Sequence, residues 1–366
     1  MKSNYEALGK HIRLVDYRNS EQVSNNVLGI SIDKEFMPSV ANVIGTDLSR
    51  YKLISKGLFA CNPMHIGRDE RLPIALYENE EPAIVSPAYF MFEIIDRTVL
   101  NEEYLMMWFR RPEFDRECWF MTDGSVRGGI SWDDLCRIQL PVPPYERQLD
   151  VVESYRAITR RIAMKKEIND NLAEYLNCIY VEQAKDTQDA IPLSEICKYV
   201  TDKSAFSDIE SHVYVSTENI LPDKQGVASF GTTDPSERVT YFQAEDVLVS
   251  NIRPYFKKMW FATTSGGCNA DVLCFRALDK KYAYLLKSIM FQDGFFDYVM
   301  SGAKGTKMPR GDKTHIMLYP IPRFSETQLL KFNTLANSIE QKQAQNRQEM
   351  QHLEVVKGMI LTTLSR

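Results

Sequence analysis

The chain repeats itself in order, and this duplication constrains its fold more than any other feature of the sequence. Segments of the first half recur in the second half, and the offset between partners is about 185–190 residues early in the chain and about 179 late. Chance similarity between two stretches of ordinary α/β sequence is the alternative, but chance matches would scatter instead of keeping their order. The matching pairs are residues 8–12 with 193–196, 26–32 with 212–217, 57–62 with 246–251, 88–92 with 271–275, 104–105 with 284–285, Phe114 with Phe295, and 121–143 with 300–322.

Each repeat ends with a proline step that leads into a long helical pattern. The steps are Pro141-Val142-Pro143-Pro144 and Pro320-Ile321-Pro322. Because proline fixes φ and disfavours helix at the residue before it, both steps predict an extended entry to a helix. Apolar residues then recur at about heptad spacing, and each pattern predicts a helix about 55–60 Å long. These residues are Leu149, Val152, Ile158, Ile162, Leu172, Leu176 and Ile179 after the first step, and Leu329, Phe332, Leu335, Ile339, Met350, Leu353, Ile360 and Leu364 after the second.

Helices of this length are too long for the interior of one small domain, so their apolar seams predict that they pair with each other. An antiparallel pair, a coiled coil, would hold one globular domain at each end, as in a dumb-bell with approximate two-fold symmetry. Both seams become polar near the middle, and such positions lower stability but help to fix the register. The predicted fold class is therefore α+β: similar α/β domains at 1–145 and 186–324, with long spacer helices at 146–185 and 325–366.

Composition and charge argue against several classes of protein. The formal net charge of −5 argues against a polycationic nucleic-acid coat, although a DNA reader needs positive charge on one face only. The seven cysteines are scattered and form no C-x-x-C pair, which indicates reduced thiols rather than disulfides or a zinc site. No apolar run is long enough to cross a membrane, and the first residues do not read as a secretory signal. These features predict a cytoplasmic protein without membrane contact.

The order of domain, proline step and long helix, occurring twice, resembles the specificity (S) subunit of type I restriction–modification systems. The resemblance covers essentially the whole chain. It is carried by Leu140-Pro141-Val142-Pro143-Pro144-Tyr145-Glu146-Arg147-Gln148, which is similar to the family's P-L-P-P-x-x-x-Q step into a helix. The second copy departs from this pattern by one extra residue before Gln328. Residues 213–220 and 124–135 are also similar to family segments.

The resemblance implies a function that composition and spacing do not supply. The chain would be a DNA-binding specificity subunit with two target-recognition domains, each reading one half of a split target in double-stranded DNA. The helices would act as a spacer and would dock two methyltransferase (modification) subunits. Restriction subunits would complete the nuclease, and S-adenosylmethionine and ATP would be bound by these partners.

Motifs for chemistry in the chain itself are missing from the sequence. An amino-methyltransferase would need Asn/Asp-Pro-Pro-Tyr/Phe, and neither Cys61-Asn62-Pro63-Met64 nor Asn251-Ile252-Arg253-Pro254-Tyr255 fits. No glycine-rich loop or G-x-x-x-x-G-K-[ST] motif indicates nucleotide binding, and the histidines lack metal-ligand spacing. We therefore expect a non-catalytic chain with no cofactor or metal of its own. A carboxylate/lysine nuclease site stays open, because its residues are common ones.

DNA contacts are expected from loops of each globular domain, where phosphate contacts give affinity and base contacts give sequence: arginine suits guanine, asparagine or glutamine suits adenine, and serine or threonine suits either. One loop follows the strand pattern that ends at residue 60 or 249, and a second, glycine-rich loop precedes each proline step. A plain solvated loop is the alternative for each. Ser86 and Asn269 precede another strand and could face the groove or cap a turn. The candidates are Asn62, His65, Arg68, Arg71, Ser125 and Arg127 in the first repeat, and Asn251, Arg253, Tyr255, Lys257, Lys258, Lys304, Thr306, Lys307, Arg310 and Lys313 in the second.

Three other functions stay open on the sequence alone. The chain could serve as the recognition subunit of a different methyltransferase or phage-defence assembly. It could be a scaffold whose helices and globular ends bind proteins. An α/β metabolic enzyme would require a constellation of polar residues that the sequence does not display.

Overall fold

The computed structural model describes residues 5–39, 45–64, 66–122, 128–185, 187, 189–209, 213–227, 229–231 and 238–364, with only the backbone of Arg68. The chain divides into two compact units. Unit 1 consists of Met1–Lys165 and Glu349–Arg366, and unit 2 of Lys166–Gln348. The predicted α+β class with two long helices is confirmed.

Unit 1 is built on a four-stranded antiparallel sheet with the order β2-β9-β6-β7. The central strand β6 is buried on both faces. Phe59 and Cys61 pack with the helices in one apolar cluster, whereas Ala60 packs toward the second sheet in another. The sheet is therefore covered by helices on one face and by the sheet β4-β3-β8-β5 on the other. The strands are β1 (Tyr5–Ala7), β2 (Ile12–Leu14), β3 (Val27–Ile30), β4 (Phe36–Pro38), β5 (Lys52–Ile54), β6 (Phe59–Cys61), β7 (Ile74–Leu76), β8 (Ala83–Val85), β9 (Phe90–Ile94) and β10 (Gln139–Pro141), and the helices α1 (Ile66–Asp69), α2 (Glu102–Phe109), α3 (Pro112–Phe120) and α4 (Trp132–Arg137).

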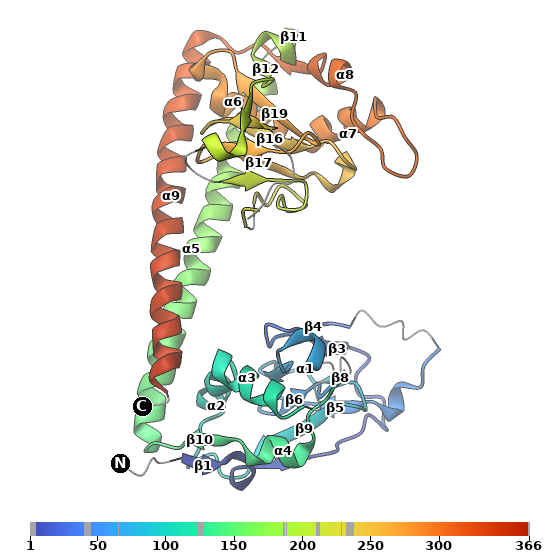
Figure 1. The fold of residues 1–366 in the computed structure, drawn as a ribbon, viewed down its shortest axis with the longest axis vertical. Helices are drawn as coiled ribbons and strands as arrows, with labels where there is room; N and C mark the ends of the chain where they lie inside the picture. Colours follow the sequence, from blue (N-terminus) through green and yellow to red (C-terminus); the bar gives the residue numbers. More distant parts are fainter. Residues whose placement is uncertain are drawn as a thin grey trace. The chain divides into compact units, whose positions relative to one another are not determined.

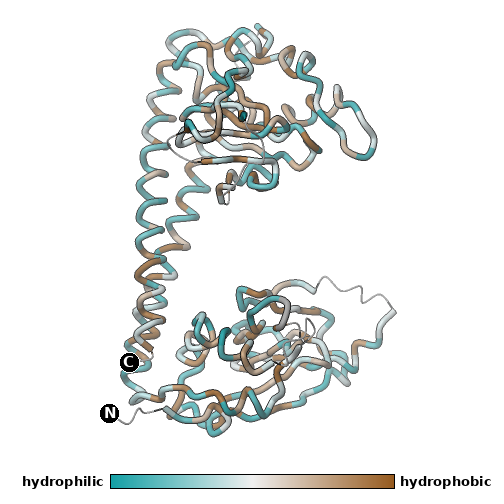
Figure 2. Tube along the Cα trace, viewed as in Figure 1, coloured by the Kyte–Doolittle hydropathy of each residue, from teal (hydrophilic) through white to brown (hydrophobic). Residues whose placement is uncertain are grey.

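Unit 2 has the same plan. Its main sheet has the order β12-β19-β16-β17, and β16 again divides its side chains between two clusters, Val247 and Val249 toward the helices and Leu248 toward the second sheet. Figure 2 shows hydrophobic residues concentrated in these inner strands. The strands are β11 (Ala190–Pro192), β12 (Cys197–Tyr199), β13 (Lys203–Ala205), β14 (Tyr214–Val215), β15 (Arg238–Phe242), β16 (Val247–Ser250), β17 (Met259–Phe261), β18 (Gly266–Cys268), β19 (Val272–Ala277) and β20 (Pro320–Pro322), and the helices α6 (Ala283–Met290), α7 (Asp293–Ser301) and α8 (Lys313–Met317).

Strand pairing is equivalent in the main sheets of the two units and in the inner strands of their second sheets, β4-β3-β8-β5 and β13-β15-β18-β14. Each second sheet contains one parallel pair, β3 with β8 and β14 with β18. The outer edges differ in extent. The β13–β15 pairing of unit 2 corresponds to an isolated bridge between Arg18 and Lys52 in unit 1, and the β3–β4 pairing of unit 1 corresponds to isolated bridges in unit 2, Tyr214 with Gly231 and Ile220 with Val227. Each proline step lies in or next to a short strand, β10 or β20, which pairs antiparallel with the first strand of its unit, β1 or β11. These equivalences support duplication over chance similarity.

The structure corrects the alignment of the central strands. The sequence comparison pairs residues 57–62 with 246–251, which matches Phe59 with Leu248. In the sheets, Phe59 lies opposite Phe92 and Val247 lies opposite Phe275, so Val247 is the equivalent of Phe59. A shift of one residue exchanges the two faces of a strand, and an all-apolar strand offers no alternation that would reveal it. Asn62 is consequently equivalent to Ser250, not to Asn251.

Two long helices complete both units, α5 (Tyr145–Lys185) and α9 (Glu326–Thr363). In each unit they lie side by side and antiparallel (Figure 1). In unit 1, Val152 and Tyr155 share a core with Leu364, and Arg161 pairs with Glu349. In unit 2, Leu176 and Tyr180 share a core with Ile339, Ala336 and Leu329. No helix within the described residues has both the length and the apolar character needed to cross a membrane.

The glutamines of the two proline steps have different roles. Gln148 is fully buried and makes three hydrogen bonds: Nε2 donates to the carbonyl oxygens of Val99 and Pro143, each over 2.8 Å, and Oε1 accepts from the Asn101 amide. It joins the proline step to the start of α2. Gln328 instead forms a capping box with Ser325 at the start of α9. The extra residue before Gln328 accounts for this difference.

Candidate nucleic-acid interface

The loop between β16 and β17 holds five of the candidate residues of unit 2. Arg253 and Lys257 both have left-handed backbone conformations, with φ of 50° and 51°, on either side of a short 3-10 turn over Pro254–Phe256. Such conformations are costly for residues other than glycine, and they cluster at functional sites. The turn leaves the Tyr255 ring 47% exposed against the ring of Phe256. The loop thus presents an aromatic ring between two cationic residues.

The second loop, between α7 and α8, forms a short hairpin. Lys304 and Arg310 exchange both backbone hydrogen bonds over 2.9 Å, and Gly305 takes a φ of 98° that favours glycine. Thr306, Lys307 and Met308 at its tip are exposed. Figure 2 shows this loop as mostly hydrophilic. The hairpin therefore holds its basic residues in a defined backbone frame.

The structure brings these two loops together. Ile252 and Arg310 form a β-bridge, and the Arg253 amide donates to the Pro309 carbonyl oxygen over 2.8 Å. Gly311 permits this approach, because a Cβ atom there would lie 3.0 Å from Asn251 Oδ1 and 2.8 Å from a Val299 methyl group. Unit 2 therefore has one continuous surface made of both predicted loops, which we call the loop 251–258/302–313 surface.

Aspartates pair with three cations of this surface. Lys304 contacts Asp312 over 2.6 Å, Arg310 contacts Asp271 over 3.1 Å, and Lys257 contacts Asp293 over 3.0 Å. The Lys304 ammonium lowers the pKa of Asp312 to about 2, so this pair stays charged across the physiological range. DNA phosphates would compete with these carboxylates for the cations.

Other candidates on this surface differ in how accessible they are. Lys307 is exposed and has no carboxylate partner among the residues that the structure describes. Lys313 lies exposed, with its ammonium 5.9 Å from the Tyr199 ring. Lys258 instead donates to the Thr217 carbonyl oxygen over 2.8 Å, so its ammonium is engaged within the domain. Asn251 is buried.

Buried polar atoms without a protein partner gather at the ends of β16 and β19. Within the described part of the chain, Asn251 Oδ1, Arg253 Nε and Asn269 Oδ1 have no hydrogen-bond partner. Such atoms are rare in folded proteins and mark places where water or a ligand group completes the bonding. The sequence singled out all three residues, but it gave no sign that Asp271, Asp293 and Asp312 would face the cations. Their partners lie in separate loops, which no local pattern connects.

In unit 1 the two equivalent loops are also hydrogen-bonded to each other, but the structure describes fewer of their candidate residues. The Ile130 amide donates to the Pro63 carbonyl oxygen over 3.1 Å, so the loop before the proline step is the donor here, whereas in unit 2 that loop accepts, at Pro309, from the Arg253 amide. Asn62 Oδ1 accepts from the Met64 amide, and Arg71 pairs with Asp33 over 3.1 Å. His65, Ser125 and Arg127 lie outside the described residues, as does the side chain of Arg68. Ser86 caps a turn by accepting from the Ala88 amide.

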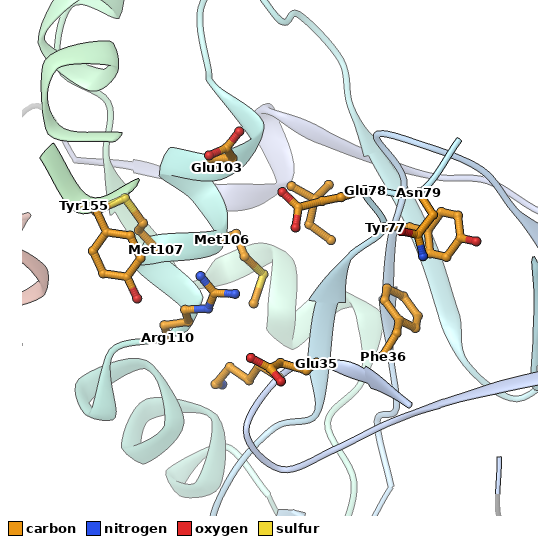
Figure 3. A pocket seen from close by; sticks show the side chains of 12 residues that line it. Glu35, Phe36, Tyr77, Glu78, Asn79, Glu103, Met106, Met107, Arg110 and Tyr155 are labelled. Atoms are coloured by element: carbon orange, nitrogen blue, oxygen red, sulfur yellow. The ribbon is translucent and has the colours of Figure 1, made fainter. Parts of the chain in front are cut away.

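A cavity of about 270 Å³ opens in unit 1 beside β7, α2 and α5 (Figure 3). Acidic side chains of Glu35, Glu78 and Glu103 and the Arg110 guanidinium surround it, together with Met106 and other apolar groups. This mixed lining does not single out a ligand class. The described residues contain no cluster of histidine, cysteine and acidic side chains arranged to hold a metal ion.

Comparisons with known proteins give matches at the level of structure only. No family model and no curated protein sequence matches the chain. The crystal structure of a type I restriction–modification S subunit from M. genitalium matches it with a TM-score of 0.54 and 12% identity, over 99% of this chain and 96% of that one. A structure from work on complex assembly and conformational transition of the type I R-M system has a TM-score of 0.49 and 13% identity, over 99% and 97% of the two chains. The HsdS subunit from Thermoanaerobacter tengcongensis has a TM-score of 0.38 and 14% identity, over 99% and 96%.

The first of these matches bears on the resemblance that the sequence indicates. It extends over nearly the full length of both chains, so it includes both repeats and both long helices. The chain has the fold of a type I S subunit, and the predicted resemblance is confirmed at that level.

Proposed function

We propose that this chain is the non-catalytic DNA-recognition subunit of a type I restriction–modification complex, and that each unit reads one half of a bipartite target. The observation that carries the proposal is the meeting of the two predicted loops in unit 2, within the fold of an S subunit. Cationic, aromatic and amide groups converge there, as base and phosphate contacts require. Unit 1 supplies the equivalent loops for the other half.

The partners follow from the same proposal. Two methyltransferase subunits dock on the chain and supply S-adenosylmethionine and the reaction. Restriction subunits add ATP-driven nuclease activity. The long helices act as the spacer between half-sites, and the protein works in the cytoplasm.

A domain exchange tests the proposal. Residues 1–145 are replaced by the corresponding domain of an S subunit with a known target, and the chimera is expressed with the methyltransferase subunit. Methylome sequencing should then show one half of the methylated motif changed and the other half kept. A motif that changes in both halves contradicts independent reading, and methylation or cleavage by the purified chain alone contradicts a non-catalytic role.

Charge reversal distinguishes DNA recognition from a protein scaffold. Lys304, Lys307 and Arg310 are replaced together by glutamate, which reverses three exposed charges of the loop 251–258/302–313 surface. The assembled complex should lose DNA affinity. If its affinity is unchanged while assembly is intact, the chain is better described as a scaffold.

A further inference from the structure

Each repeat contains an Asp-Lys dipeptide that lies in a turn and whose lysine has a left-handed backbone. Asp33-Lys34 and Asp223-Lys224 are 190 residues apart, 223 − 33, which matches the offset of the early repeat segments. Asp33-Lys34 lies in the turn between the paired strands β3 and β4, and Asp223-Lys224 lies in the turn closed by the bridge between Ile220 and Val227, a few residues after β14. Both lysines have left-handed backbones, with φ of 65° and 62°. Residues other than glycine rarely take this conformation, and it persists where surrounding contacts hold it.

In unit 1 the lysine joins the turn to a helix and to a predicted DNA-contact loop. Lys34 Nζ donates to Asp115 Oδ1 on α3 over 2.6 Å and to the Leu72 carbonyl oxygen over 3.1 Å. The same Asp115 oxygen accepts from the Leu72 amide over 3.0 Å. The ammonium also lies 5.1 Å from the centre of the Phe114 ring. Leu72 directly follows the candidate Arg71, which itself pairs with Asp33.

Unit 2 has the same arrangement of chemical groups. Lys224 Nζ donates to Asp293 Oδ1 on α7 over 2.7 Å and to the Phe291 carbonyl oxygen over 3.1 Å, and it lies 4.8 Å from the Phe291 ring centre. Asp293 Oδ1 also receives Lys257 of the β16–β17 loop. The backbone amides of Asp223 and Lys224 donate to the carbonyl oxygens of Phe256 and Lys257, each over 2.9 Å.

Only the lysine and its neighbour are equivalent in sequence. The carboxylate comes from the first turn of α3 or α7 but from different positions in it. The burial also differs, because the side chain of the carboxylate is 11% exposed for Asp115 and 60% exposed for Asp293. The three-way connection of turn, helix and loop is common to both units even though its individual residues are not, which favours a positional role over an accident of packing.

From these contacts we infer that Lys34–Asp115 and Lys224–Asp293 are positioning pairs that fix the DNA-reading loops 70–73 and 253–258 in their conformations. Each pair ties the loop to the helix α3 or α7 and to the turn after β3 or β14. In unit 2 the pair holds Lys257 and the turn over Pro254–Phe256, which places Tyr255 and Arg253. The role of these pairs in DNA reading rests on the proposed function, whereas their role in fixing the conformation of the loop does not.

Hydrogen exchange on the full chain tests the hold on the loop directly. Asp293→Ala removes the acceptor of both Lys224 and Lys257 and should speed exchange of the amides at 223–224 and 256–257 at least tenfold. Asp293→Glu keeps the charge and should restore most of the protection. Asp297→Ala is the matched control, because Asp297 is an exposed carboxylate one turn further along α7 and its loss changes the net charge equally. Asp115→Ala should likewise speed amide exchange in the loop 70–73. If Asp115→Ala fails to fold, the inference is tested with the more exposed Lys224–Asp293 pair of unit 2.

DNA discrimination of the complex with its methyltransferase subunit is the second measurement. Asp293→Ala should reduce discrimination against base changes in one half-site at least tenfold and leave the other half-site unaffected, while the melting temperature stays close to that of Asp297→Ala. Unchanged exchange at 223–224 and 256–257 overturns the inference. Faster exchange with full discrimination overturns the positioning role. A wild-type complex that does not discriminate contradicts the proposed function, and the hold on the loop is then judged by exchange alone.

Discussion

The Arg253 amide donates to the Pro309 carbonyl oxygen over 2.8 Å, which connects two loops that are more than fifty residues apart in the sequence. The β-bridge between Ile252 and Arg310 lies directly beside this bond. Two separate loops with scattered basic residues thereby become one surface. In unit 1 the Ile130 amide donates to the Pro63 carbonyl oxygen, so the equivalent loops are also joined, by a hydrogen bond of the opposite direction.

Lys307 should contribute a phosphate contact, because it is exposed at the tip of the hairpin and no described carboxylate neutralises it. Lys307→Ala is expected to weaken binding about equally for all DNA sequences and to reduce the slope of log Kd against log salt by about 1. The measurement is a salt titration of DNA binding by the complex with its methyltransferase subunit. Lys280→Ala is the control, since Lys280 is 85% exposed but lies away from both loops. Equal slopes for the two variants would exclude Lys307 from the interface.

Gln148 and Gln328 should differ in their contributions to stability although they occupy similar places after the two proline steps. Gln148→Ala removes three hydrogen bonds of a fully buried side chain and leaves two carbonyl oxygens and one amide, all partly buried, without that partner, and we expect a loss of about 2–3 kcal/mol. Gln328→Ala removes only one side of a capping box and should cost about 0.5–1 kcal/mol.

Urea unfolding followed by tryptophan fluorescence measures this difference. Trp108, Trp119 and Trp132 lie in unit 1 with Gln148, whereas Trp260 lies in unit 2 with Gln328, so far-UV circular dichroism, to which both units contribute, is recorded alongside the fluorescence. A Gln148→Ala midpoint no lower than that of Gln328→Ala would mean that the buried hydrogen bonds are not needed to join the proline step to α2.

Much of the fold could be predicted because its signals are local or repeated. The apolar seams of α5 and α9 repeat every few residues, and proline steps precede both helices, so the helices follow from the sequence alone. The register of β6 and β16 could not be predicted, because Phe59–Cys61 and Val247–Val249 are apolar without interruption and either face can be buried.

The candidate site could be predicted only in part, for a physical reason. Residue type indicates which loops are candidates for DNA contact, and the structure does place Arg253 and Arg310 on one surface. The pairing of Arg310 with Asp271, or of Lys257 with Asp293, depends on contacts between loops without periodicity. The same holds for Lys258, whose ammonium is engaged by the Thr217 carbonyl oxygen.

Glu340 on α9 should make unit 2 sensitive to acid. Burial raises the pKa of this carboxyl, but Lys287 and Arg347, each 2.7 Å away, outweigh burial and bring the pKa below its ordinary value of 4.5. Since the folded pKa is the lower one, the stabilisation is fully present above pH 4.5 and is lost as the pH falls through the folded pKa. Glu340→Gln should therefore cost about 1–2 kcal/mol at pH 7, and less as the pH approaches 3. Urea midpoints of both proteins from pH 7 to pH 3 measure this, and a constant gap between them would contradict the assignment.

Asn346 is buried in the helix pair of unit 2, where its Nδ2 donates to Asn169 Oδ1 over 2.8 Å and Gln343 Nε2 donates to the Asn169 carbonyl oxygen. This polar layer interrupts two apolar seams, so it should fix the register of α5 against α9 while lowering stability.

Asn346→Leu removes one partner of a buried pair and is expected to cost about 1–3 kcal/mol. The double variant Asn169→Leu/Asn346→Leu replaces both partners with apolar groups and should recover most of that loss. Urea unfolding of the wild type, both single variants and the double variant gives the coupling energy between the two positions. If the double variant loses the sum of the two single losses, the asparagines act independently and the layer does not set the register.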